Sequence, residues 1–259
     1  MSAARWVVLG AAALAAVLAT LVGFAPASLV DRALDEASLG RVRLADASGS
    51  VWRGAGRFVL SEGPGPADAG PVVQGFALPG TLRWELRALP LLFGLIDASV
   101  ASDTLAQTVR ISGQPGELRL SAGSLDLPSA QLARLGSPWN TIQPAAAVSL
   151  RWDALTIRNG VIDGRASIEL RDVASAMTPV RPLGTYRIDV NGNGRDVALT
   201  LATLSGPLRL QGSGSWDRRA GVRFTAEAQA EGPERQRLSS LLGLVGRREG
   251  ERTIIRIGG

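Results

Sequence analysis

The chain of 259 residues contains no cysteine and no histidine. Without cysteine it can form no disulfide, no thiolate metal site and no cysteine nucleophile. Histidine is the usual general base and metal ligand near neutral pH, so its absence argues strongly against catalysis. The serines have no evident base to activate them. We therefore expect a protein that is not an enzyme and that needs neither a metal nor another cofactor.

Lysine is also absent, so all 28 basic residues are arginine, set against 23 acidic residues. The high isoelectric point partly reflects the missing lysine, cysteine and histidine. Most arginines stand singly between apolar residues, whereas nucleic-acid-binding sites gather them in a run or on one face. We expect solvated strand faces and no nucleic-acid partner. Without lysine there is no Walker loop for a nucleotide.

Charge is missing altogether from Trp6–Val30, a run of 25 residues. Roughly 20 helical residues cross a hydrocarbon core of about 30 Å, so the run is long enough to span a membrane. Residues 6–30 are therefore predicted to be a transmembrane anchor. Its large apolar residues include Trp6, Val7, Leu14, Leu18, Leu21 and Phe24.

Two alternatives to an uncleaved anchor exist. Ala25-Pro26-Ala27 has small residues at the spacing that signal peptidase reads, but the apolar run is longer than a usual signal peptide core. A buried helix of a soluble domain would show a polar face, and this run has none. Arg5 precedes the run and Asp31 follows it, so the positive-inside rule places residues 1–5 in the cytoplasm and 31–259 across the membrane.

The exported part reads as mainly β. Apolar and polar residues alternate in Leu82–Ala88, Val148–Asp153, Tyr186–Val190 and Val197–Leu201, which is typical of strands with one buried face. Asn159-Gly160 is a strong hairpin signal because both residues tolerate positive φ. The spacing of 8–12 residues between strand signals predicts a long, curled, mostly antiparallel sheet that is either an open groove or sandwich-like.

Helices are predicted at three places. Leu29, Ala33 and Ala37 recur at helical spacing within Ser28–Ser38, and a short helix is expected at Ser129–Leu135 after Pro128. A third begins near Pro233 and is stopped by Gly246. Leu89–Ile96 is a continuous apolar run that fits either a buried strand or a surface touching lipid. Two similar halves, about 40–145 and 146–259, form a weak internal repeat.

No constellation carries an evident chemistry. Gly192-Asn193-Gly194 lacks the third glycine of a dinucleotide fingerprint and is read as a turn. Asp153, Asp163 and Glu169 could converge on a cation, but exposed strand faces explain them better. Core packing or an interfacial role is the default for the tryptophans, with a stacking site for sugar or lipid as the alternative.

Several short motifs, in order, resemble the type II secretion system protein N (GspN) family. They are the segments 48–54, 78–84, 182–186, 204–216 and 238–247. The residues that carry the likeness are Gly49, Val51, Trp52, Gly54, Pro79, Gly80, Trp84, Pro182, Leu183, Gly184, Tyr186, Gly206, Leu208, Gly212, Gly214, Trp216, Leu241, Leu242 and Gly246.

The resemblance implies a single-pass inner-membrane protein whose periplasmic domain assists the export of folded proteins across the outer membrane. Its expected partners are other type II secretion subunits, either the inner-membrane platform or the outer-membrane secretin. The family offers no catalytic residues to carry over. A wider likeness to AsmA-type envelope proteins leaves a second hypothesis open, in which a hydrophobic β-groove binds or transfers lipid.

Overall fold

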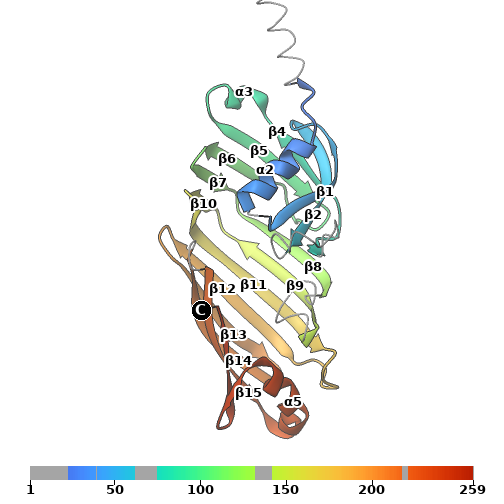
Figure 1. The fold of residues 1–259 in the computed structure, drawn as a ribbon, viewed down its shortest axis with the longest axis vertical. Coiled ribbons are helices and arrows are strands. Elements are labelled where there is room, and N and C mark those ends of the chain that lie inside the picture. Colours follow the sequence, from blue (N-terminus) through green and yellow to red (C-terminus); the bar gives the residue numbers. More distant parts are fainter. Residues whose placement is uncertain (1–22, 39, 62–74, 132–141, 218–220, 259) are drawn as a thin grey trace, which may run out of the picture.

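The chain folds around one antiparallel sheet of 17 strands in the computed structural model, which describes residues 23–38, 40–61, 75–131, 142–217 and 221–258 (Figure 1). The first strands are β1 (Val42–Gly49), β2 (Arg53–Ser61), β3 (Gly75–Ala77), β4 (Leu82–Leu86), β5 (Ile96–Ser102), β6 (Val109–Gln114), β7 (Glu117–Leu120) and β8 (Gly123–Gln131). They are followed by β9 (Pro144–Trp152), β10 (Leu155–Arg158), β11 (Val161–Ser175), β12 (Gly184–Asn193), β13 (Val197–Ser205), β14 (Leu208–Asp217), β15 (Gly221–Ala230), β16 (Arg247–Glu249) and β17 (Arg252–Ile257). The prediction of a mainly β protein with an open antiparallel sheet is confirmed.

Most strands pair with the strand that precedes or follows them. Strands β4 to β7 and β11 to β15 form two meanders of this kind, and β17 joins β15 at the far end. The long strand β11 connects the meanders. Its first residues, 161–163, pair with β10, which in turn pairs with β7, while residues 166–175 pair with β9 on the same edge.

The hairpins predicted from turn chemistry are present. Asn159 and Gly160 both have positive φ (49° and 80°) between the paired residues Arg158 and Val161. Only a turn of this type matches the twist of a two-residue hairpin. Gln114 likewise pairs with Glu117 across the turn between β6 and β7.

The helices are short and few in the described ranges. They are α2 (Ser28–Ser38), α3 (Ala88–Leu91), the 3-10 turn η2 (Gly232–Glu234) and α5 (Arg235–Val245). Helices α2 and α5 lie near opposite ends of the sheet (Figure 1). The predicted helices at 28–38 and after Pro233 are confirmed, and Gly246 does follow the last helical residue.

Helix α2 is fixed to the sheet by one side chain. Asp31 accepts a hydrogen bond from the backbone amide of Leu44 at 2.7 Å and another from the guanidinium of Arg43 at 3.3 Å. The helix therefore turns Val30 and Leu34 toward the sheet. Leu29, Ala33 and Ala37, whose spacing predicted this helix, lie on its exposed side.

Two further expectations are corrected. Ser129 to Gln131 belongs to strand β8 and not to a helix; residues 132–141 lie outside the described ranges. The register of β8 shifts between Leu127 and Ala130, and Pro128 lies in this irregularity, which is one of the places where a sheet tolerates proline. Leu89–Ile96 is not a buried strand, since residues 88–91 form α3 and only Ile96 begins β5.

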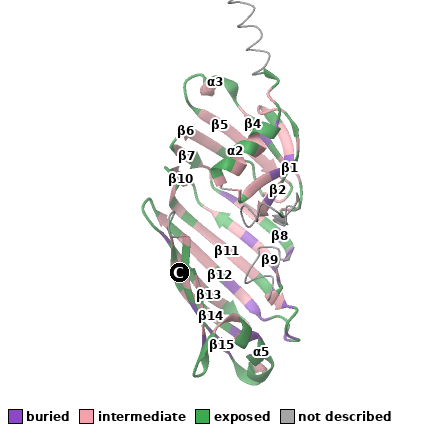
Figure 2. Cartoon of the chain, in the orientation of Figure 1, coloured by how far each residue is buried: buried purple, intermediate pink, exposed green. Residues whose placement is uncertain are grey.

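The core is divided into two clusters. The larger gathers Leu183, Tyr186, Leu208 and the α5 residues Leu238 and Leu241, and the smaller gathers Ala27, Leu44 and Trp84. Between them most strand residues are only half-buried, as the scarcity of buried positions in Figure 2 shows. The sheet thus has a helix over each end of one face and no helix over its middle among the described residues.

The predicted anchor falls almost entirely outside the described ranges, which hold none of Trp6, Val7, Leu14, Leu18 and Leu21. Phe24 is described and is 81% exposed. Within the described ranges no helix is both long and apolar enough to cross a membrane. The transmembrane anchor and the division into two halves both remain predictions.

Candidate functional site: a half-exposed apolar face

Register pairing places the apolar side chains of the carboxyl-terminal meander on one face. Cross-strand partners point to the same side of a sheet, so a chain of partners defines a row. One row consists of Leu125, Leu150, Ile168, Ile188, Leu201, Gly212, Ala226 and Ile255. The next row on the opposite face is polar throughout and consists of Arg151, Ser167, Asp189, Thr200, Ser213, Thr225 and Arg256.

The same apolar face continues into the amino-terminal meander. One of its rows consists of Leu86, Ala98, Ile111, Leu120 and Leu155. The residues Leu155 and Ile157 of β10 share this face with Ile162 of β11. Both meanders therefore contribute to one continuous apolar surface, and strands β10 and β11 are where it passes from one to the other.

Two hollows lie on this surface. The carboxyl-terminal hollow has a volume of about 460 Å³ between strands β11 to β17 and helix α5. Its floor includes Ile188, Leu199 and Leu201, and its wall includes Leu241 and Leu242 of α5. Every residue that lines it is apolar except for the hydroxyl of Tyr186. A hollow of this character suits a hydrocarbon chain or an apolar side chain better than a polar ligand.

The amino-terminal hollow has a volume of about 500 Å³ and lies beside helix α2. Val30 and Leu34 of α2 form one wall, and Trp84, Leu150 and Trp152 contribute to the rest. Leu150 and Ile168 are neighbours in the apolar row described above, and Ile168 is the neighbour of Ile188 in the other hollow. The two hollows are thus linked by half-buried apolar side chains.

Glycine–aromatic pairs recur along this face. Trp84 lies across Gly54 on the neighbouring strand, and Trp152 lies across Gly123 in the same way. Each indole NH donates to a backbone carbonyl, that of Val51 at 3.1 Å for Trp84 and that of Ser121 at 3.0 Å for Trp152. The aromatic ring covers the backbone that glycine leaves bare, which restores packing at a position with no side chain.

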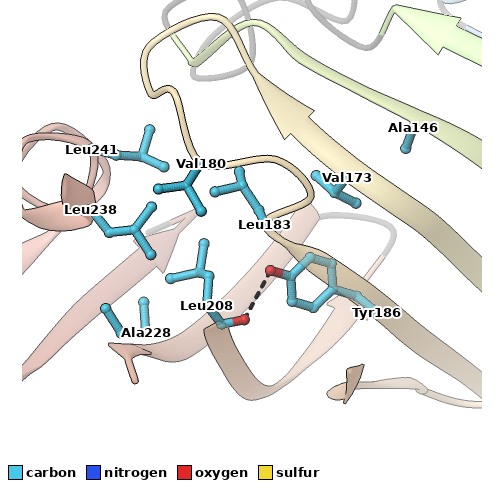
Figure 3. Packing of buried hydrophobic residues seen from close by; sticks show 10 residues of the cluster. Ala146, Val173, Val180, Leu183, Tyr186, Leu208, Ala228, Leu238 and Leu241 are labelled. Carbon is cyan, nitrogen blue, oxygen red and sulfur yellow. Dashed lines mark hydrogen bonds between the residues drawn. The ribbon is translucent and has the colours of Figure 1, made fainter. Parts of the chain in front are cut away.

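The motif residues from the later half of the sequence meet at the carboxyl-terminal hollow (Figure 3). Tyr186 is 2% exposed, and its hydroxyl donates to the carbonyl of Leu208 at 2.9 Å. Leu208 in turn donates its amide to the carbonyl of Leu183 at 3.0 Å. Burial raises the pKa of the Tyr186 phenol well above its ordinary value. The segments 182–186 and 204–208 therefore form one buried unit.

Gly206 lets these two segments approach closely. Its φ is 115°, and a Cβ there would meet the carbonyl oxygen of Leu183 at 2.6 Å. Gly184 lies in the same contact, and Pro182, which follows a cis peptide bond, precedes Leu183 in the chain. Helix α5 closes the unit through Leu238 and Leu241, whose side chains point toward it in Figure 3. Leu242 lines the adjoining hollow.

The early motif residues gather at the opposite end. Gly49 ends β1, Val51 and Trp52 lie in the turn that leads to β2, and the Val51 amide donates to the carbonyl of Ala25 at 2.9 Å. Pro79 and Gly80 line the amino-terminal hollow with Trp84. The remaining motif residues, Gly212, Gly214 and Trp216, alternate along β14 on the apolar face, and Gly246 follows α5. These placements are structural, and the functional roles of the motif residues remain predictions.

The opposite face carries ion pairs between neighbouring strands. Arg53 pairs with Glu85 at 2.7 Å, and Arg252 pairs with Glu227 at 2.8 Å. Such exposed pairs contribute about 0–1 kcal/mol each, so their main effect is to keep this face soluble. In the described ranges no three His, Cys, Asp or Glu side chains are grouped to hold a metal ion, and Asp153, Asp163 and Glu169 do not converge.

These features define an open-sheet β protein with a polar face and a half-exposed apolar face that carries two hollows. A family model described as type II secretion system (T2SS), protein N matches residues 40–255, so the chain belongs to that family. The resemblance drawn from the motifs is confirmed, and membership makes the protein a type II secretion component. No curated protein and no solved structure matches the chain.

Proposed function

We propose that this protein is a non-enzymatic accessory component of type II secretion that is held in the inner membrane and works through contacts of its periplasmic sheet. Residues 6–30 are the membrane anchor, with the amino terminus in the cytoplasm and residues 31–259 in the periplasm. Family membership supports the secretion role, and the uncharged run supports the anchor. The half-exposed apolar face is the observation that supports a binding role, because a large exposed apolar patch is costly unless a partner covers it.

The topology is tested with single cysteines, since the natural chain has none. Ser213 lies in the polar row and is exposed, whereas Ser2 precedes the anchor. In intact cells with a permeabilised outer membrane, a membrane-impermeant maleimide should label the Ser213→Cys variant. It should label the Ser2→Cys variant only after lysis. The reverse pattern would show that the proposed orientation is wrong.

The secretion role is tested by deleting the gene and measuring enzymes that the system exports into the medium. Complementation with the natural chain should restore export. Two variants on strand β13 then compare the two faces. Leu201→Gln places an amide in the apolar row, while Thr200→Gln changes an exposed residue on the polar face. We expect impaired export with the first and normal export with the second, provided that both accumulate and melt like the natural chain.

Unchanged export in the deletion strain would contradict the secretion role. Normal export with Leu201→Gln would instead show that the apolar face is not the contact surface. Partner subunits would then have to bind elsewhere, for example at a sheet edge by addition of a strand.

A second candidate function, the binding or transfer of envelope lipid, is favoured by the apolar lining of both hollows. The two candidates differ in what contacts Leu199, which lies on the floor of the carboxyl-terminal hollow. A photo-crosslinking amino acid replaces Leu199 in one variant and Thr200 in the matched control. Each variant is activated by light in cells grown with radioactive phosphate. A radiolabelled adduct at Leu199 alone indicates phospholipid. An unlabelled adduct of higher mass indicates a protein subunit.

A further inference from the structure

The most exposed large apolar side chains of the described residues concentrate at one end of the molecule. Phe93 is 80% exposed, Leu92 is 79% exposed and Leu89 is 73% exposed. All three belong to the connection between β4 and β5, called the apical loop here (residues 88–95). Isolated apolar residues at a surface need no explanation, but three on one turn form a patch that marks a protein or membrane contact.

The apical loop lies at the end where the uncharged run joins the sheet. Gly23 and the loop residues Ala88, Leu89 and Pro90 line the same surface hollow. Figure 1 shows α3 and the first described residues, which lead into α2, at the same end of the sheet, with α5 at the other. Phe24, which is 81% exposed, directly follows Gly23. The loop is therefore next to the point at which the proposed anchor enters the membrane.

Residues 23–27, called the junction here, are held to the sheet by backbone hydrogen bonds. The amide of Val51 donates to Ala25, and the amide of Ala27 donates to Gly49 at 3.2 Å. Strand β4, which leads into the loop, is joined to the same turn, because the amide of its last residue, Leu86, donates to the carbonyl of Trp52 at 2.7 Å. The junction and the strand that leads into the loop are thus bonded to one turn, and the junction and the loop line a common hollow.

Four amides of the loop are hydrogen-bonded within the loop itself, which favours contact with lipid. The amides of Leu92, Phe93 and Gly94 each donate to the carbonyl three residues earlier, at 3.0 to 3.2 Å. The amide of Leu95 donates to Pro90 at 2.9 Å. Unpaired backbone groups cost several kcal/mol in hydrocarbon, so a self-bonded turn with outward apolar side chains is suited to the bilayer interface.

The base of the loop is charged. Asp97 lies between Arg87, at 3.0 Å, and Arg110, at 2.8 Å. The hydrogen bond from Arg110 and the charges of both arginines hold the pKa of Asp97 below its ordinary value, so it stays ionised. Two guanidinium groups and one carboxylate give the base of the loop a net positive charge, which suits anionic lipid headgroups.

We infer that the apical loop inserts Leu89, Leu92 and Phe93 into the outer leaflet of the membrane that holds the anchor, as a second attachment point. The inference rests on the proposed anchor for the identity of the membrane. Two attachment points restrict the tilt of the sheet. Leu86 lines both the hollow beside Gly23 and the amino-terminal apolar hollow. Docking of the loop therefore brings one end of the apolar face to the membrane surface.

The test uses the full chain in nanodiscs of phosphatidylethanolamine and phosphatidylglycerol. Single-cysteine variants carry the environment-sensitive fluorophore NBD at Leu92 or Phe93. Nitroxides attached near the headgroup or deep in the acyl chains report the depth of each label. We expect blue-shifted emission at both positions and quenching that is stronger from the shallow nitroxide.

A matched control is available on α5, because Leu244 is another exposed leucine (53%) but lies at the opposite end of the sheet. NBD at Leu244 should be quenched by neither nitroxide. A third label, at Ala12 within the uncharged run, reports the anchor and should be quenched most by the deep nitroxide.

The outcomes separate the inference from the proposed function. Quenching at Ala12 without quenching at Phe93 overturns the apical contact and leaves the anchor standing. Quenching at Phe93 without quenching at Ala12 supports the contact and overturns the anchor. Equal quenching at Leu244 and Phe93 shows that the labels partition nonspecifically, which also overturns the inference. A protein partner on the loop would leave Phe93 unquenched in nanodiscs that hold this chain alone.

Discussion

The contact between Gly123 and Trp152 offers the most direct quantitative test of the apolar face. Gly123 is not held at positive φ, so alanine fits its backbone without strain. An added Cβ, however, would lie 2.8 Å from Cε2 and 3.0 Å from Cη2 of Trp152. All three of its nearest neighbours are atoms of this one ring. Any cost of Gly123→Ala must therefore come from the indole.

The size of the effect follows from the distances. Carbon atoms prefer separations of about 3.5–4.0 Å, so the ring has to move by roughly 1 Å, and overpacking of this kind costs about 1–3 kcal/mol. The smaller entropy of the unfolded alanine chain returns about 0.4–1 kcal/mol. We expect Gly123→Ala to destabilise the fold by about 1–2 kcal/mol. Trp152→Leu alone also destabilises it, because the ring no longer covers Gly123.

The double variant, which combines Gly123→Ala with Trp152→Leu, is the informative measurement. Once leucine replaces the indole, the added methyl group no longer meets a ring, so the two losses should not add. We expect a favourable coupling of at least about 1 kcal/mol in urea unfolding of the full chain in detergent, followed by circular dichroism. Gly243→Ala on α5 is the control, since nothing lies within 4 Å of its added Cβ, and it should stabilise by up to about 1 kcal/mol. Additivity of the pair within about 0.5 kcal/mol would refute the proposed packing.

Three further predictions concern single groups. Tyr186→Phe removes the hydrogen bond to Leu208 and should cost about 0.5–1.5 kcal/mol in the same unfolding assay; no loss would contradict a buried bond. Burial raises the pKa of Tyr186, so above pH 10 the phenol ionises more readily in the unfolded chain than in the folded one. Its contribution to the free energy of unfolding is therefore complete below pH 10 and declines above it. Absorbance of the single tyrosine should show no ionisation near pH 10 until the chain unfolds. Asp31→Ala leaves the amide of Leu44 without its side-chain acceptor and should lower stability by about 1–3 kcal/mol, whereas Asp31→Asn, which keeps an acceptor, should cost less than about 1 kcal/mol; equal losses in thermal melts would assign the effect to the charge of Asp31.

Local signals in the sequence predicted the local structure well. The alternation of β4 and the Asn159-Gly160 turn depend on neighbouring residues only, and both are present. The same holds for α5, whose apolar spacing and terminal Gly246 mark its ends. Backbone propensity and turn chemistry decide such features before any distant contact forms.

Features that depend on distant pairing were missed. The interval Ser129–Gln131 reads as helix in isolation but extends a strand because residues 145 and 146 of β9 pair with it. The glycine–tryptophan contacts join strands about 30 residues apart, so their partners could not be read from one segment. A signal for them does exist, since Gly54, Gly123 and Gly214 each fall in phase with the apolar positions of their strands. At these three positions a ring from a neighbouring strand, that of Trp84, Trp152 or Phe224, covers the glycine.

The face that α2 buries could not be predicted either, for a different reason. The spacing of Leu29, Ala33 and Ala37 predicts the helix, but spacing alone cannot tell which of two adjacent stripes meets the sheet. The side chain of Asp31 decides it by binding Leu44, which rotates Val30 and Leu34 inward. A polar contact, invisible in a hydrophobic pattern, thus sets the orientation of an amphipathic helix.

Among the described residues, the helices are too short to cover the whole apolar face. A sheet of 17 strands is far longer than two helices of 11 residues, each of which spans about 16 Å. The helices therefore cover the ends, where the two core clusters form, and leave Ile168 and Ile188 half-exposed between them. A protein that needed only stability could bury these residues with one more helix. That the apolar row is continuous from Leu125 to Ile255, while its neighbour is polar throughout, argues that the uncovered middle is kept for a partner or a lipid.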